Sequence, residues 1–204
     1  MNPEMIDANT TIWSIGHSSQ PLAKFLGLLR THQIATVVDV RSQPSSKYSP
    51  QFNSAPLREA CIDHGVEYVF AGTELGGRPR GSKYYDADGR VLYGLVAQSP
   101  EFLQGIDQLL AIAAVEGRTA IMCAEENPTD CHRRLLIGRV LRDRGVPLKH
   151  IRGNGIVEDE SLVEKRSRSG ASLQPSLFGE HEVTTWKSIR SVLQRGQQPT
   201  SLGH

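Results

Sequence analysis

Residues 119–145, TAIMCAEENPTDCHRRLLIGRVLRDRG, place a short apolar run directly before a long segment with helical character. The run TAIMCA has the length of a buried strand, and polar residues close it. The segment DCHRRLLIGRVLRDRG is predicted to be a helix that ends at Gly145, because glycine is typical of the position just after a helix. A strand joined to a helix in this way is the unit from which α/β folds are built.

The same alternation of strands and helices continues along the chain. Strands are predicted at TIWSIG (11–16), ATVVDV (35–40), VEYVFA (66–71) and LKHI (148–151), the last being the final strand, and helices at 21–33, 54–65 and 100–117. Residues 72–94 are rich in glycine and tyrosine and are too long for a plain connection. The pattern therefore predicts an α/β fold with a mostly parallel sheet and helices on both faces, a Rossmann-like three-layer sandwich.

The composition fits one globular domain with some additional chain. The 204 residues suffice for a hydrophobic core, and 23 basic against 22 acidic residues give a formal charge of +1, which excludes neither nucleic acid nor an acidic substrate. Three cysteines do not make a disulfide framework, so we expect reduced thiols. Neither a signal peptide nor an apolar stretch of roughly 20 residues is recognisable, so a cytoplasmic protein is expected.

A change of composition near residue 153 predicts the end of the folded domain. We expect a single α/β domain at 11–152 and a flexible C-terminal tail at 153–204. Within the tail, EKRSRSGASLQPSLFGE (164–180) lacks the apolar period of a core-forming element. The run VTTWKSIRSVLQR (183–195) is compatible with one short helix.

Polar side chains follow four of the predicted strands. In an open α/β sheet, ligands bind beyond the carboxyl ends of the strands, where such loops converge. The residues are His17 after the first strand, Asp39 and Arg41 at the end of the second, Gly76, Gly77 and Arg78 after the third, and Cys123 and Glu125 after the fourth, with Cys131, His132 and Arg133 from the next helix. Their convergence predicts a functional site at this edge of the sheet.

One interpretation of the site is a cysteine nucleophile. Cys131 is expected in the first turn of its helix, where exposed amides and the helix dipole favour a thiolate. Cys123, at the strand end, is the other candidate. His17 or His132 would act as the base, and Asp39 would orient that base.

The other interpretation is a metal site. Cys123, Cys131 and His132 would hold a zinc or iron ion, which accepts sulfur and nitrogen ligands. Seven residues separate the two cysteines, more than in the C-x2–4-C pattern of common zinc sites. A phosphatase loop does not fit, because the pattern C-x5-R is absent and Glu125 and Glu126 would repel a phosphate.

Structural roles compete with these interpretations at several positions. Cys61, on the apolar side of the 54–65 helix, is expected to be a core residue. Asp39 and Arg41 could form a salt bridge at the edge of the sheet, and His17 could be a turn residue bonded to the backbone.

Four sequence blocks resemble a known family. IWSIGHSS (12–19), VVDVRSQPSSKYSPQFN (37–53), YVFAGTELGGRPR (68–80) and IMCAEENPTDCHRRLLIGRVL (121–141) are similar to the signature blocks of the family named domain of unknown function 488. The resemblance implies an α/β domain and no particular reaction. It also implies a shared site built from His17, Asp39, Arg41, Pro44, Gly76, Gly77, Cys123, Glu125, Cys131, His132 and Arg133.

The predicted tail carries a second resemblance. QPSLF (174–178) is similar to the Q-L-S/D-L-F peptide with which bacterial replication and repair proteins bind the DNA sliding clamp, although Pro175 replaces the usual leucine. In such a peptide, the glutamine and two apolar side chains fill a preformed pocket. Here these residues would be Gln174, Leu177 and Phe178.

Together these features predict an enzyme, a hydrolase or lyase, that acts on nucleic acid or a nucleotide-derived substrate in DNA repair. The expected substrate-binding residues are Arg41, Arg78 and Arg133 for an anion, Pro44, Gly76 and Gly77 beside it, and Tyr84 with Tyr85 for stacking on a base. Glu125, Asp39 and the candidate histidines would transfer protons. The alternative is a non-catalytic adaptor that binds a ligand or DNA and is recruited to the sliding clamp.

Overall fold

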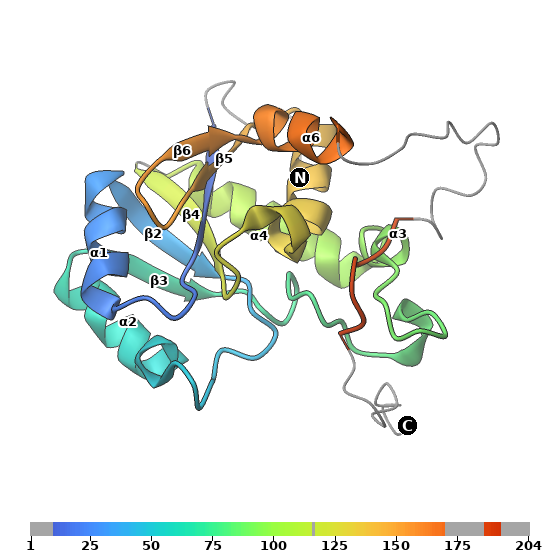
Figure 1. The fold of residues 1–204 in the computed structure, drawn as a ribbon, viewed down its shortest axis with the longest axis horizontal. Helices are drawn as coiled ribbons and strands as arrows, with labels where there is room; N and C mark the ends of the chain where they lie inside the picture. The colour runs from blue at the N-terminus through green and yellow to red at the C-terminus, as the bar shows by residue number, and fades with distance from the viewer. Residues whose placement is uncertain (1–9, 116, 170–185, 193–204) are drawn as a thin grey trace.

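The structure is a computed structural model of the chain and describes residues 10–115, 117–169 and 186–192. A six-stranded sheet with the order β3-β2-β4-β1-β5-β6 forms its centre (Figure 1). The strands are β1 Ile12–Gly16, β2 Ile34–Asp39, β3 Glu67–Phe70, β4 Arg118–Cys123, β5 Leu148–Ile151 and β6 Val157–Asp159. Strands β1 to β5 are parallel, and β6 is antiparallel to β5.

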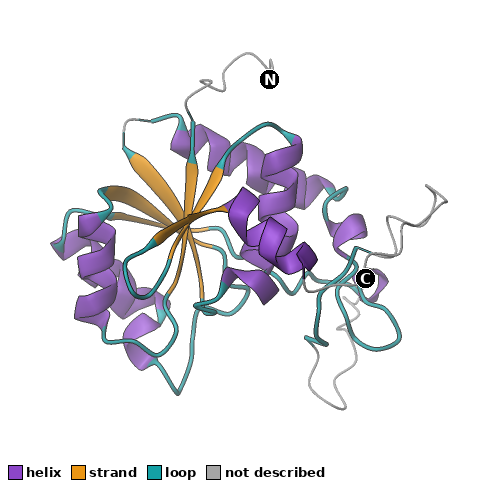
Figure 2. Ribbon diagram, turned by 45° about the horizontal axis from the view of Figure 1, so that its top comes forward, coloured by secondary structure: helices purple, strands orange, loops and turns teal. Residues whose placement is uncertain are grey.

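Helices cover both faces of the sheet (Figure 2). They are α1 Leu22–Thr31, α2 Ser54–Asp63, α3 Tyr93–Val96, α4 Pro100–Ala113, α5 Arg139–Asp143 and α6 Glu160–Ser169, with the short turns η2 Pro50–Phe52, η3 Ser82–Tyr84 and η4 Pro128–Asp130 and the π-helical η5 Arg133–Gly138. None of the helices in the described residues is both long and apolar enough to cross a membrane. This arrangement confirms the predicted α/β sandwich.

Alternating residues on the central strands belong to two separate cores. Val37 on β2 and Met122 on β4 pack in one cluster with side chains of α1 and α2. Their neighbours Val38 and Ile121 pack in the other cluster, with side chains of α4 and α5. Because both faces are buried, these strands appear in the sequence as continuous apolar runs without a polar alternation.

The parallel register brings the strand exits next to one another. Gly16 at the end of β1 is opposite Cys123 at the end of β4. Asp39 at the end of β2 is opposite Met122 on one side and Phe70, the last residue of β3, on the other. The loops that follow these four strands therefore start from the same edge of the sheet, as predicted for the site.

The folded structure continues past residue 152, where the sequence analysis placed the end of the domain. LKHI is not the final strand, because the chain turns at Asn154-Gly155 and returns as β6, and α6 follows. The amide of Arg152 donates to the carbonyl of Ile156 at 2.8 Å, and Gly155 has φ +85°, which glycine adopts without strain. An Asn-Gly pair between two extended runs is a hairpin signal that the sequence analysis did not use.

A buried polar chain attaches α6 to the sheet. His150 Nε2 lies 2.7 Å from Glu160 Oε2 and donates to it, so Nδ1 accepts from the Ser14 hydroxyl at 2.6 Å. Arg134 Nε donates to the same Glu160 at 2.9 Å. Burial lowers the pKa of His150, although the bond to Glu160 acts in the opposite direction. The folded state therefore favours a neutral imidazole at this position.

Residues 186–192 lie against the domain as a segment without helix that bends at Ile189 and Arg190, and we call it the C-terminal strap. The amide of Ser188 donates to the carbonyl of Val91 at 2.9 Å, and Trp186 Nε1 donates to the carbonyl of Leu135 at 2.8 Å. The predicted short helix is not present in this described part of 183–195. The clamp-like peptide at 174–178 lies outside the described residues.

The lowered pKa of His150 predicts a pH dependence of stability. The unfolded chain gains a proton near the ordinary pKa of 6.5, whereas folded His150 stays neutral to lower pH. The stabilising contribution is therefore complete above about pH 6.5 and is lost as the pH falls towards the folded pKa, at up to about 1.4 kcal/mol per pH unit. Urea unfolding between about pH 7.5 and pH 5.5 should show a smaller loss of stability for His150→Asn than for the wild type.

The control is His64→Asn, a change at an exposed histidine. Equal pH dependence in the wild type and His150→Asn would show that this imidazole is not the titrating group.

Candidate metal centre

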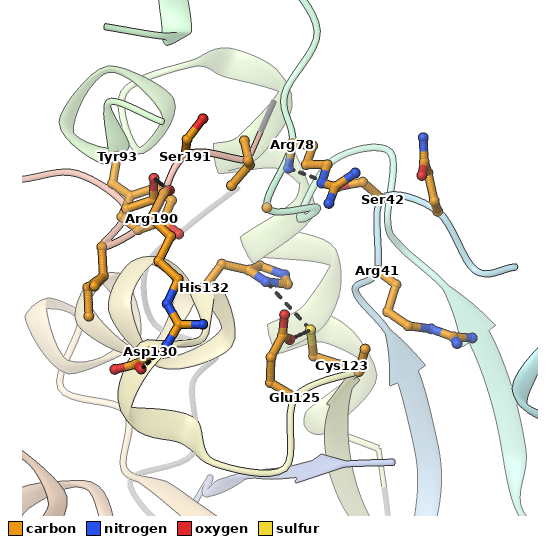
Figure 3. A pocket seen from close by; sticks show the side chains of 16 residues that line it. Arg41, Ser42, Arg78, Tyr93, Cys123, Glu125, Asp130, His132, Arg190 and Ser191 are labelled. Atoms are coloured by element: carbon orange, nitrogen blue, oxygen red, sulfur yellow. Dashed lines mark hydrogen bonds and ion pairs between the residues drawn. The ribbon is translucent and has the colours of Figure 1, made fainter. Parts of the chain in front are cut away.

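Two sulfurs and one imidazole nitrogen meet at the carboxyl end of β4. The ligand atoms of Cys123, Cys131 and His132 all lie within 4.8 Å of one another. His132 Nδ1 is 3.6 Å from Cys123 Sγ and 3.8 Å from Cys131 Sγ. All three side chains are buried. Figure 3 shows Cys123 and His132 directed towards one another beside Glu125.

The loop between the cysteines folds back at the turn Pro128–Asp130. The side-chain oxygen of Asn127 accepts a backbone amide of this turn at 3.1 Å. Cys131 then has an extended conformation, with φ −95° and ψ 142°, and its carbonyl accepts the amide of Arg134 at 3.0 Å. The sequence predicted that Cys131 lies in the first turn of the helix. In the structure it precedes the helix. Its sulfur consequently lies near the end of β4.

The second ring nitrogen of His132 determines its tautomer. His132 Nε2 is 3.0 Å from the carbonyl oxygen of Val40. Because a carbonyl only accepts hydrogen bonds, Nε2 carries the proton in the neutral ring, and Nδ1 presents its lone pair to the sulfurs. Histidines that bind metal ions are commonly oriented by a hydrogen bond of this kind.

The distances fit ligands arranged around one tetrahedral ion. Zinc–sulfur bonds of about 2.3 Å and zinc–nitrogen bonds of about 2.0–2.1 Å place sulfur and nitrogen ligands about 3.6 Å apart at tetrahedral angles. The two observed sulfur–nitrogen distances are 3.6 and 3.8 Å. Thiolate and imidazole ligands suit zinc and iron better than magnesium or calcium. The residues present therefore fit a zinc or iron ion.

Glu125 adds a carboxylate at the same point. Its Oε2 accepts hydrogen bonds from Cys123 Sγ at 2.8 Å and from Cys131 Sγ at 3.3 Å. Burial acts to raise the pKa of Glu125, but the hydrogen bonds, first of all that from Cys123, hold the pKa below its usual value. An ionised carboxylate in this position can serve as a fourth metal ligand or can accept a proton from a bound molecule.

The free thiol of Cys123 is poorly suited to be a nucleophile. Its hydrogen bond with Cys131 and then its burial raise the pKa of Cys123 well above the usual value. Two unit charges 4 Å apart interact by about 4 kcal/mol at an effective dielectric constant of about 20, so two thiolates beside a carboxylate repel strongly. A divalent cation would offset these charges and displace the thiol protons. For Cys123, the electrostatics therefore favour the metal interpretation over the nucleophile.

Arg133 supports the loop from inside the protein. Its side chain is fully buried and donates to the carbonyls of Glu125 and Glu126, the second at 2.7 Å. Its Nη1 also lies 3.7 Å from Cys131 Sγ. Arg133 does not line the pocket described below. The guanidinium thus holds the loop and lies near the sulfur of Cys131. The sequence predicted that Arg133 binds a substrate anion, but its side chain is buried outside the pocket.

Asp39 and Arg41 form a buried ion pair at the end of β2. Arg41 Nε donates to Asp39 Oδ1 at 2.9 Å, and Arg41 Nη2 donates to Oδ2 at 2.6 Å. The hydroxyl of Tyr68 donates to the same Oδ2 at 2.6 Å. The carboxylate is thereby occupied by Arg41 and Tyr68, and no hydrogen bond in the described residues joins it to a histidine. The salt-bridge alternative accounts for this pair.

His17 belongs to the same group of side chains. Its Nδ1 donates to the carbonyl of Ser18 at 2.7 Å, so its Nε2 accepts from Arg41 Nη1 at 3.0 Å. The ring is stacked on Phe52 with a centroid distance of 4.3 Å. Burial lowers the pKa of His17, and the residue does not line the pocket. Of the two candidate histidines, His132 is therefore the one in contact with the sulfurs.

The predicted glycines allow close packing around the site. A Cβ on Gly77 would lie 2.7 Å from His132 Cγ, and one on Gly76 would lie 2.4 Å from Ser42 Oγ. Gly16, which the sequence analysis did not single out, has the same role, because its Cβ would lie 1.8 Å from the Glu125 carbonyl oxygen. A glycine that ends a strand before a polar loop is the signal that could have identified it.

The other predicted substrate-binding residues are spread over the same end of the protein. The ring of Tyr84 is buried in the larger core and is not available for stacking on a base, while the hydroxyl of Tyr85 donates to the carbonyl of Pro79 at 2.7 Å. The carbonyl of Pro44 accepts the amide of Ser54, which starts α2, at 2.9 Å. The side chain of Arg78 is exposed at the pocket.

A pocket of about 350 Å³ opens onto one side of the sulfur–imidazole cluster. Cys123, Glu125 and His132 line it, whereas Cys131 does not. The remaining lining residues are Arg41, Ser42, Gln43, Gly77, Arg78, Tyr93, Ala124, Asp130 and 188–192. Sequence reasoning missed Tyr93 and the strap, because nothing in a linear pattern places these segments beside the end of β4.

Comparison with known proteins identifies one family. The family model described as "Domain of unknown function DUF488" matches residues 21–140, more than half of the chain. This confirms the resemblance inferred from the sequence blocks. No curated protein and no solved structure matches the chain. The matched range includes Cys123, Cys131 and His132, and it excludes His17 and the C-terminal strap.

The geometry predicts that the purified protein binds a metal ion. Elemental analysis after anaerobic purification should find about one zinc or iron ion per chain, because thiolate sites release their protons to a bound cation. Cys123→Ser, Cys131→Ser and His132→Gln should each reduce this content severely. Cys61→Ala removes the third cysteine, which is buried on α2, and should leave the metal content unchanged.

Metal content of the wild type near zero, or equal content in all four variants, would refute the site.

Proposed function

The chain belongs to the DUF488 family, and we propose that it is a metal-dependent hydrolase acting on a nucleotide or nucleotide-derived substrate. The observation that carries the proposal is that Cys123, Cys131 and His132 converge at one point that a pocket reaches from one side. Zinc sites with three protein ligands and one open position are typical of catalytic centres, whereas structural sites are closed by four. Since Cys131 does not line the pocket, the open position would lie on the side of Cys123 and His132.

Zinc is the ion that this donor set favours. Two thiolates and one imidazole form a soft to borderline set that zinc accepts in tetrahedral geometry, and ferrous iron is the alternative. When bound, the ion would supply Lewis acidity towards water or a substrate oxygen in the pocket.

Glu125 is the proposed proton acceptor. Its carboxylate is within hydrogen-bond distance of both sulfurs and lines the pocket, so a water molecule in the pocket can be reached from it. Its pKa below the usual value keeps it in the basic form at neutral pH. The neighbouring carboxylate of Glu126 is not equivalent, because both of its oxygens bind Arg152 at 2.9 Å.

The same four groups occur in one known type of nucleotide chemistry. Zinc enzymes that hydrolyse the exocyclic amine of a nucleobase hold zinc through histidine and two cysteines and use a glutamate that is not a ligand to transfer protons. In such a reaction, the water oxygen bonds to the ring carbon, the carbon–nitrogen bond breaks, and ammonia leaves with the proton first taken by the glutamate. A pocket of about 350 Å³ has the size expected for a small ligand, and the exposed Arg78 beside it suits an anionic group.

Activity should depend on the metal and on Glu125. Zinc-loaded protein assayed with nucleoside 5′-monophosphates should release ammonia, and removal of zinc by a chelator should abolish the release until zinc is restored. Glu125→Gln should lower the rate about 100-fold or more while zinc stays bound, because general-base catalysis contributes about 10²–10⁴-fold. Glu126→Gln is the matched control and should keep the rate.

Loss of zinc from Glu125→Gln would instead show that Glu125 is the fourth ligand of a closed structural site. This result would refute the proposed hydrolase activity. Tight binding of nucleotides without turnover would favour the non-catalytic adaptor.

Recruitment to the DNA sliding clamp is a separate proposal, and the sequence of 174–178 alone supports it. Wild-type protein should be retained on immobilised clamp, and the double variant Leu177→Ala, Phe178→Ala should lose most of this retention, because these side chains would fill the apolar pocket. Equal retention of both proteins would exclude the peptide as the contact. Neither substitution should change the metal content, which keeps this test independent of the hydrolase.

A further inference from the structure

The C-terminal strap forms a wall of the pocket although it is distant in sequence from the metal centre. The pocket is lined by Ser188, Ile189, Arg190, Ser191 and Val192 together with residues of the loop that follows β2. Figure 3 shows Arg190 directed between Asp130 and Glu125, and Arg78 across the pocket from it. The strap thus contributes a cation to a site whose proposed metal ligands all lie between residues 123 and 132.

The strap is attached on both sides of Arg190. On one side, Trp186 donates to the carbonyl of Leu135, and the guanidinium of Arg139 lies 4.2 Å from the centre of its ring. Lys187 Nζ forms an ion pair with Asp86 at 2.8 Å. On the other side, the amide of Val192 donates to the carbonyl of Gly89 at 3.1 Å. These contacts hold the backbone at Arg190 beside the pocket.

The guanidinium of Arg190 remains available to a ligand. Its side chain is 84% exposed, and its ion pair with Asp130 has a nitrogen–oxygen distance of 3.6 Å, too long for a good hydrogen bond. An exposed pair of this kind contributes little stability, typically about 0–1 kcal/mol. By contrast, Arg41 is committed to Asp39, and Arg133 is buried against carbonyls. Arginine forms paired, charge-assisted hydrogen bonds with phosphate oxygens.

We propose that Arg190, together with Arg78 on another wall of the pocket, binds the phosphate group of the substrate, so that the C-terminal strap selects phosphorylated over uncharged ligands. The inference rests on the proposed function only in assigning the bound molecule as a substrate. It names the substrate class as a nucleoside monophosphate or a nucleotide at a chain end, with the phosphate between the two arginines and the reacting group directed towards Cys123 and Glu125.

Binding measurements on the full chain test this assignment. Inorganic phosphate, a nucleoside 5′-monophosphate and the corresponding nucleoside are titrated into zinc-loaded protein by calorimetry. The monophosphate should bind more tightly than the nucleoside, and Arg190→Ala should weaken phosphate and monophosphate about tenfold or more while leaving the nucleoside unchanged. Arg190→Lys should recover part of the affinity, because the charge is kept and the planar fork is lost.

Arg142→Ala is the matched control, since Arg142 also forms an exposed ion pair but does not line the pocket. It should bind all three ligands like the wild type. Trp186→Ala provides a second route to the same result, because detaching the strap should weaken phosphate binding with Arg190 still present. Unchanged melting temperature and zinc content identify the variants that remain folded.

Wild-type affinity for phosphate in Arg190→Ala, or no phosphate binding by the wild type, would overturn the proposal. Repeating the titrations on zinc-free protein separates the two proposals. If phosphate binding depends on Arg190 but the protein never takes up metal, the proposed anion site stands and the proposed hydrolase is refuted. Stoichiometric zinc without Arg190-dependent phosphate binding would refute the anion site and would leave the proposed hydrolase intact.

Discussion

The candidate site depends on one fold-back of the chain, and a buried guanidinium holds it in place. Arg133 is fully buried, and its Nη1 and Nη2 donate to the carbonyls of Glu125 and Glu126, whereas its Nε has no hydrogen-bond partner among the described residues. Burying an arginine costs several kcal/mol unless its donors are satisfied, so these carbonyls have to face inwards. Once they do, the loop is closed, Cys131 lies beside Cys123, and Glu125 reaches both sulfurs. The position of the donor set thus depends on the two carbonyls that this buried guanidinium binds.

Two clusters of charged and polar side chains stand side by side at the edge of the sheet, and they differ in composition. Asp39 and Arg41 neutralise each other, and Tyr68 supplies a further hydrogen bond, so this group needs no other partner. The cluster of Cys123, Cys131 and Glu125 contains three potential anions with Arg133 at its margin. Adding a divalent cation would let both thiols ionise. The difference supports a structural role for the Asp39–Arg41 pair and agrees with the metal site proposed for the cysteine cluster.

Elements whose signal is local were predicted well, and those that depend on distant partners were not. The apolar runs that became β1 to β5 and the helices between them follow from burial on both faces of a parallel sheet. The hairpin to β6 also had a local signal, Asn154-Gly155, which was overlooked. The strap had none, because its attachment depends on Val91 and Leu135, far away in the sequence.

The sequence by itself determined the alternating architecture, the edge of the sheet where the polar residues gather, the family, and the identity of the candidate ligands. Only the tertiary structure decided how these residues are divided. It paired Asp39 with Arg41, turned Arg133 inwards, buried Tyr84, and brought Arg190 to the pocket. The physical reason is the distance along the sequence over which each interaction acts. Strand and helix periodicity and turn chemistry act over a few residues, whereas the partner of a charged side chain is chosen by distances between segments that meet only after folding.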